Sequence, residues 1–160
     1  SPRLKSFPPL IQGGGQEGGY RSGTEATPAI FGFAAAAEAG RQTFRQDIQR
    51  EAELLHSLCE KLSALPGVKL NGAHEAPHIL NVAIPGLPTQ NSINLLQDRG
   101  ICVSAGSACA KGHRSHVLSA MGIDGETIDA SFRISLSRET TQEDADLLAQ
   151  AVEEALLPRI

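Results

Sequence analysis

Apolar residues recur every three or four positions in the first part of the chain, which is the period of one face of an α-helix. The stripe they form consists of Phe44, Ile48, Ala52, Leu55, Cys59 and Leu62. Upstream, Thr27 suits a helix N-cap, and Pro28 suits the first turn, where its missing N–H costs no hydrogen bond. The pattern therefore predicts one long helix over residues 28–65, with Cys59 as a core side chain on its buried face.

Shorter segments are continuously apolar or alternate, as β-strands do. Three of them are predicted to be strands: residues 68–70, 78–84 and 101–103. A fourth, residues 131–136, has apolar side chains at its even-numbered positions and polar ones, including Arg133, at its odd-numbered positions. Because side chains alternate between the two faces of a strand, Arg133 is predicted to lie on the face opposite the core.

Three further segments are predicted to be helices: residues 92–99, 115–121 and 141–157. Ser115 is a suitable N-cap for the second of these, and Gly100 and Gly122 follow the first and second, where helices commonly end. This order of elements predicts an α+β fold. A small antiparallel or mixed sheet is covered by helices and preceded by the one long helix.

The composition is that of a soluble globular chain, with 160 residues of which 41% are hydrophobic and 20% charged. A net charge of −4 and an aromatic content of 4% argue against a nucleic acid or an anionic membrane as partner. No apolar stretch has the length of a membrane span, and the first residues lack the features of a signal peptide.

The cysteines, Cys59, Cys102 and Cys109, have spacings that fit neither a disulfide framework nor a zinc site. The histidines likewise lack metal-ligand spacing, so no metal site is predicted. Unpaired cysteines favour a reducing compartment, the cytoplasm. The chain has no initiator Met and opens within loop-like sequence, so we expect it to be part of a longer protein.

Cys109 stands among small residues, in the sequence Ser-Ala-Gly-Ser-Ala-Cys-Ala-Lys-Gly over residues 104–112. Such neighbours let a loop move and a substrate approach, whereas a core cysteine normally has bulky apolar neighbours. Lys111, His113 and Arg114 follow at once, and nearby positive charge favours the thiolate over the thiol. By itself the segment is equally compatible with a small-residue turn that carries an incidental cysteine.

Three motifs stand in order along the chain. Residues 13–25 contain GGGQE and RSGTE, residues 104–122 contain the cysteine loop followed by SHVL and AMG, and residues 132–144 contain FRISLS, TT and ED. Together, over residues 8–157, they resemble the C-terminal part of a cysteine desulfurase. This NifS/IscS-like group belongs to the class V aminotransferase family, which consists of fold-type I enzymes that use pyridoxal 5'-phosphate (PLP).

The resemblance implies a role for three residues. Cys109 corresponds to the nucleophile that takes sulfur from the substrate, L-cysteine, as a persulfide. Arg133 corresponds to the arginine that binds the substrate carboxylate, for which the parallel donors of a guanidinium are well suited. Thr24 corresponds to a threonine that contacts the PLP phosphate of the partner subunit across a homodimer interface. On the residues alone, Arg133 could equally be a surface arginine and Thr24 a simple turn residue.

Nearby residues receive weaker assignments. Arg21 is a further candidate at the same interface. His113 and His116 follow the nucleophile and could tune its pKa, but a local packing role is favoured for His116, and neither is assigned a catalytic role. The segment between Cys109 and residue 116 is shorter than in well-known members, which bears on the acceptor proteins that it can reach.

The cofactor lysine of the family lies in a Ser-His-Lys context upstream of the glycine-rich motif. The lysines of this chain, none of which has that context, are Lys5, Lys61, Lys69 and Lys111. The resemblance therefore implies that the chain supplies the nucleophile and the carboxylate-binding arginine, whereas the PLP lysine belongs to the full-length parent. The chain alone is predicted to be inactive.

Under this interpretation residues 1–30 are a remnant of the large PLP-binding domain that includes the glycine-rich interface loop, and residues 31–160 are the small C-terminal domain. The implied activity releases L-alanine and passes sulfur to an acceptor or scaffold protein for iron–sulfur clusters, thio-cofactors or tRNA. Two alternatives stay open. One is a selenocysteine lyase or another class V PLP lyase, and the other is a non-enzymatic persulfide carrier or interaction domain.

Overall fold

The computed structural model describes residues 7–73, 75–106 and 114–156. The chain divides into two compact units, Ser1–Phe44 and Arg45–Ile160. The predicted domain boundary after residue 30 stays a prediction. Within the described ranges, no helix is both long enough and apolar enough to cross a membrane.

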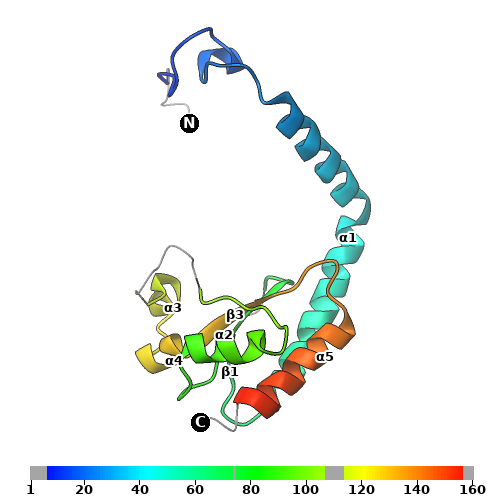
Figure 1. Ribbon diagram of the computed structural model, residues 1–160, viewed down its shortest axis with the longest axis vertical. Coiled ribbons are helices and arrows are strands. Elements are labelled where there is room, and N and C mark those ends of the chain that lie inside the picture. Colours follow the sequence, from blue (N-terminus) through cyan, green and yellow to red (C-terminus); the bar gives the residue numbers. More distant parts are fainter. Residues whose placement is uncertain (1–6, 74, 107–113, 157–160) are drawn as a thin grey trace. The chain divides into compact units, whose positions relative to one another are not determined.

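Helix α1 spans Thr27–Ser63, close to the predicted range of residues 28–65 (Figure 1). Its second half buries four leucines, Leu54, Leu55, Leu58 and Leu62. The predicted helical period is confirmed, but the predicted stripe is wrong at Phe44, whose side chain is 61% exposed, and at Ala52, which is also exposed. Cys59 is only half-buried at the edge of the core, because Leu58 occupies the central position beside it. Burial raises the pKa of the Cys59 thiol.

The sheet has three antiparallel strands in the order β1-β2-β3. Their bounds are Lys69–Asn71, Ile79–Ala83 and Ser131–Ser135. The even-numbered side chains of β2 and β3 form the buried face, with Phe132 and Val82 fully inaccessible. The predicted alternation of residues 131–136 and the predicted α+β class are therefore confirmed.

Helices cover the apolar face of this sheet. Helix α2 (Thr89–Gln97), helix α5 (Gln142–Ala151) and the π-helix η2 (Val152–Leu156) contribute Leu96, Leu148 and Leu156 to the core that the sheet shares with the second half of α1. Helix α5 begins in a capping box in which Thr141 accepts from the Asp144 backbone and the Asp144 side chain accepts from the backbone of Thr141.

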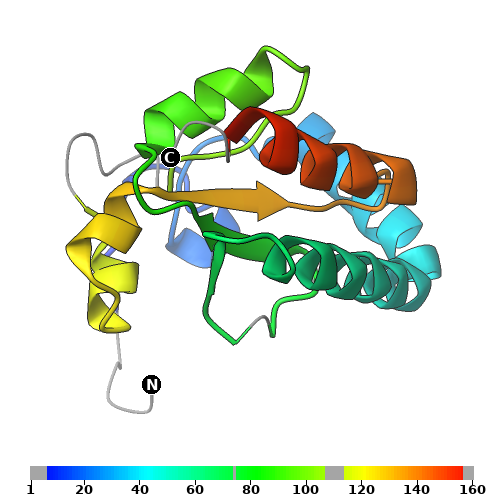
Figure 2. The same ribbon diagram turned by 90° about the horizontal axis from the view of Figure 1, so that it is seen from below.

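Two short helices, α3 (His116–Ala120) and α4 (Gly125–Asp129), lie near the start of β3 (Figure 2). Ser115 caps α3 as predicted, since its side chain accepts a hydrogen bond from the Leu118 N–H. Helix α4 was not predicted from the sequence. Its signal is Asp124, whose carboxylate accepts from the Thr127 backbone as an N-cap.

The predicted strand at residues 101–103 is wrong. These residues make no ladder, the Cys102 side chain is exposed rather than buried, and pairing is limited to a single antiparallel bridge between Ser104 and Arg133. A short apolar run does not make a strand without a partner for its backbone groups. The segment before the cysteine loop therefore pairs with β3 at one described residue, Ser104, which is the first residue of that loop.

Candidate active site

Arg133 lies in the middle of β3, on the sheet face opposite the core, as predicted. Its side chain is half-buried, and its Nε atom is fully buried with no hydrogen-bond partner among the described residues. No described residue accepts a hydrogen bond from the rest of its guanidinium. A buried donor without an acceptor is costly, so the geometry leaves Arg133 suited to an anionic ligand.

The start of the cysteine loop is attached directly to Arg133. The Ser104 N–H donates to the Arg133 carbonyl at 3.0 Å, and the Arg133 N–H donates to the Ser104 carbonyl at 2.7 Å. Cys109 itself lies outside the described residues, as do Lys111 and His113. The structure thus ties the first residue of the loop to the candidate carboxylate-binding residue and leaves the nucleophile assignment a prediction.

The segment that follows the loop is held to the residues just before β3. Arg114 makes a bidentate ion pair with Asp129, with Nε–Oδ1 and Nη2–Oδ2 distances of 2.8 and 2.6 Å. Its guanidinium lies against Gly125, where an added Cβ would be 2.5 Å from Nη1. The hydrogen bond from Arg114 lowers the pKa of Asp129 and raises that of Arg114. In the sequence, Arg114 indicates only positive charge near the thiol, and nothing local predicts Asp129 as its partner.

His116 is the first residue of α3 and is exposed. This location fits a helix N-terminal residue, and its side chain makes no hydrogen bond to any described residue of the candidate site. Asp124 and Thr127 stabilise the next helix locally, and the hydrogen bond from the Thr127 N–H lowers the pKa of Asp124.

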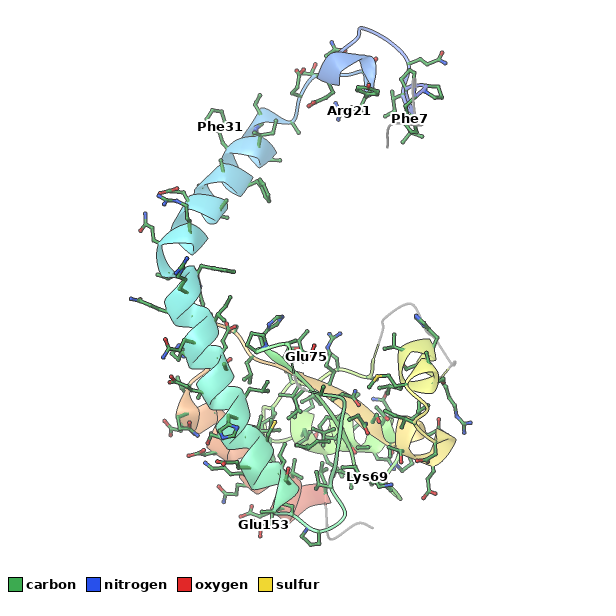
Figure 3. All side chains as sticks on the ribbon, turned by 180° about the vertical axis from the view of Figure 1, so that it is seen from behind. Phe7, Arg21, Phe31, Lys69, Glu75 and Glu153 are labelled. Carbon is green, nitrogen blue, oxygen red and sulfur yellow. The ribbon has the colours of Figure 1, made fainter. Side chains whose placement is uncertain are left out.

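In the N-terminal unit, the glycine-rich segment folds on itself through polar contacts. Ser22 is buried, its N–H donates to the Ile11 carbonyl, and Gln16 Oε1 accepts from the Gly23 N–H at 3.1 Å. The Arg21 guanidinium donates to the carbonyl of Thr24 at 3.2 Å, and the Thr24 side chain is exposed. Figure 3 shows Arg21 in this loop, within the N-terminal unit.

These residues are compatible with a phosphate contact of a cofactor. The Thr24 hydroxyl has no hydrogen-bond partner within the described part of the chain, and a guanidinium lies in the same turn. Two of the four lysines are already engaged elsewhere, because Lys61 contacts Asp146 and Lys69 donates to the Thr127 hydroxyl.

The sequence profile of the class-V aminotransferases matches residues 5–148 of this chain. The chain belongs to the class-V aminotransferase family. The family is PLP-dependent, and the matched range includes the glycine-rich segment, the cysteine loop and strand β3.

Within this family, two of the similar proteins are cysteine desulfurases. The chain is 36% identical over 159 residues to the mitosomal cysteine desulfurase of Encephalitozoon cuniculi, covering 97% of this chain and 36% of that protein. It is 38% identical over 150 residues to the cysteine desulfurase IscS of Azotobacter vinelandii, covering 91% of this chain and 37% of that protein.

A NifS-like protein from Rickettsia africae has a similar structure, with a TM-score of 0.80, 34% sequence identity and coverage of 92% of this chain and 39% of that one. The chain thus spans less than two fifths of the length of these relatives. The predicted family is confirmed, and the α+β fold of this chain is similar to the matching part of the NifS-like protein.

Proposed function

We propose that these residues form the substrate-holding and sulfur-accepting part of a PLP-dependent cysteine desulfurase. The parent enzyme takes sulfur from L-cysteine onto Cys109 as a persulfide, releases L-alanine and passes the sulfur to an acceptor protein. The observation that carries this proposal is the pair of backbone hydrogen bonds between Ser104 and Arg133. It connects the start of the cysteine loop to a guanidinium whose buried Nε has no hydrogen-bond partner in the part of the chain that the structure describes.

The roles follow from the chemistry of each group. Arg133 binds the substrate carboxylate and so fixes the position of the substrate relative to the start of the loop. The Cys109 thiolate attacks the substrate sulfur: an S–S bond forms, the C–S bond breaks, and its electron pair stays with the carbon, which takes up a proton and leaves as alanine. PLP, when bound, supplies the electron sink that weakens the C–S bond, and Thr24 would contact its phosphate.

Further features belong to the same proposal. A homodimer would let Thr24 serve the PLP of the partner subunit, which its exposed position in a polar loop supports. The acceptor would be a scaffold or carrier protein for iron–sulfur clusters, thio-cofactors or tRNA. The compartment would be the cytoplasm, a proposal supported by cysteine spacings that do not fit a disulfide framework.

The test is to replace Cys109 with Ser in the complete enzyme that contains these residues. Persulfide formation and alanine release should be abolished, because a hydroxyl cannot accept the sulfur, while the cofactor absorbance should persist. Cys102→Ser is the matched control: its thiol is exposed and lies close by in sequence, yet it should leave the activity unchanged.

A Cys109→Ser enzyme that releases alanine from cysteine at the normal rate would contradict the proposal. Activity confined to selenocysteine would indicate a selenocysteine lyase instead.

A further inference from the structure

The polar face of the sheet carries a row of side chains that ends at Arg133. Strand register pairs Asn71 with Asn81, Asn81 with Arg133, and Arg133 with Ser104. Paired residues of antiparallel strands point to the same face. The two asparagines therefore lie on the same face as the candidate carboxylate-binding arginine.

Asn81 and Arg133 are paired at close range. Both backbone groups of Arg133 are bonded to Ser104, on the side of β3 away from β2. They consequently cannot bond to Asn81, so Asn81 and Arg133 form a non-hydrogen-bonded pair, the type in which Cα atoms are only about 4.5 Å apart and side chains are closest. Both side chains are half-buried.

A chain of hydrogen bonds fixes which end of the Asn81 amide is used. The Ser131 hydroxyl donates to the Thr127 carbonyl at 2.6 Å, and that carbonyl can only accept. The Ser131 oxygen must therefore accept from Asn71 Nδ2, which lies 3.1 Å away. The same Nδ2 donates to Asn81 Oδ1 at 2.7 Å.

The donors and acceptors in this series of hydrogen bonds can be assigned in one way. Because Asn71 presents its nitrogen to both neighbours, Asn81 must present its oxygen to Asn71, and the Asn81 NH₂ group is left as a donor. No described residue accepts a hydrogen bond from it. The Asn81 amide and the Arg133 guanidinium, two donor groups for which no described residue is an acceptor, thus belong to paired residues on a half-buried face.

We infer that the Asn81 amide is a second donor to the carboxylate bound by Arg133, and that Asn71 fixes its orientation. A carboxylate has two oxygens with about four acceptor sites, so it can accept from a guanidinium and from an amide together. This inference rests on the proposed function, because it assigns a further residue to the same substrate-binding site.

Asn81→Asp in the complete enzyme is the first test. Aspartate has the same shape and can still accept from Asn71, but it replaces the donor by a negative charge facing the carboxylate. The KM for L-cysteine should rise about 10-fold or more, since hydrogen bonds to charged groups are the strong ones. The kcat should change much less, because the interaction is made equally in the ground state and the transition state.

Asn71→Asp is a second variant that leaves Asn81 in place. An aspartate at position 71 can only accept, so the Asn81 amide should turn its NH₂ group toward β1 and present its oxygen to the substrate. We expect a KM increase of several-fold without any change at a residue that touches the substrate. Because the two positions lie on different strands, this variant also tests the inference if Asn81→Asp does not fold.

Asn94→Asp is the matched control, since it adds the same charge on the exposed surface of α2, where Asn94 Oδ1 accepts from Gln90 at 2.9 Å. Its kinetics should equal those of the wild type. A folded Asn81→Asp or Asn71→Asp enzyme with an unchanged KM would overturn the inference.

Arg133→Ala separates this result from the proposed function. If Arg133→Ala raises the KM while the asparagine variants do not, only the role of Asn81 is wrong. If Arg133→Ala also leaves the KM unchanged, the carboxylate site itself is wrong.

Discussion

The two halves of helix α1 carry similar apolar side chains but differ completely in burial. In the first half Ile30, Phe31 and Phe33 are between 52 and 79% exposed. In the second half Leu54, Leu55, Leu58 and Leu62 are at most 6% exposed. Figure 3 shows Phe31 projecting from the helix in the N-terminal unit. The difference arises because the second half packs against the other residues of the core cluster of the C-terminal unit.

The two units differ in the same way. Within the described residues of the N-terminal unit, Ser22 is the buried side chain, and polar contacts hold its loop together. The C-terminal unit has a continuous apolar core on one face of a sheet and a polar site on the other. The apolar core packs against the opposite face of β3 and so fixes the position of Arg133. Among the described residues, the neighbourhood of Thr24 is fixed by local hydrogen bonds instead.

Amide hydrogen exchange should show the largest contrast between the halves of α1. Amides at residues 54–62 are expected to exchange at least about 100-fold more slowly than those at residues 30–38, because opening the second half requires disrupting the core. Exchange measured residue by residue on the 160-residue chain checks this. Equal protection in both halves would mean that the N-terminal half is stabilised by contacts that its exposed side chains do not reveal.

A matched pair of truncations should separate the halves in stability. Leu58→Ala removes a fully buried side chain and is expected to lower the free energy of unfolding by about 2–5 kcal/mol. Phe31→Ala removes a larger side chain that is 76% exposed and should change it by less than about 0.5 kcal/mol. Urea unfolding measures both. A larger loss for Phe31→Ala would contradict the comparison.

Lowering the pH should gradually reduce the free energy of unfolding of the C-terminal unit. Hydrogen bonds from Lys61 and Arg114 lower the pKa values of Asp146 and Asp129 below the usual range of an aspartate in the folded state. A lowered folded-state pKa contributes stability above the unfolded-state pKa, and this stability is lost as the pH falls through the folded-state value. The urea midpoint should therefore fall as the pH is lowered from 5 to 2.

Asp146→Asn should make that pH dependence slightly shallower, because the variant has no proton to take up at this position. Each of these pairs is exposed, so the individual effect is small. An unchanged slope would show that the Lys61–Asp146 pair contributes nothing to folding.

The sequence predicted those elements whose signals are local. Ser115 and Thr141 both stand at helix N-caps, and the alternation of residues 131–136 placed Arg133 correctly on the polar face. The helix α4 was missed because it is only one turn long and has no apolar period. The run at residues 101–103 was misassigned because its apolar character says nothing about whether a strand lies beside it.

The amino-acid sequence by itself determined the long helix α1, the three strands of the sheet, the two faces of the sheet and, through three ordered motifs, the family. It determined these because period, capping and residue type act over a few neighbouring positions. Only the tertiary structure decided which apolar residues are buried, that Ser104 is bonded to Arg133, and that Asn71 orients Asn81. These contacts join residues that are 10 to 29 positions apart, and strand register, which no single segment specifies, brings them together.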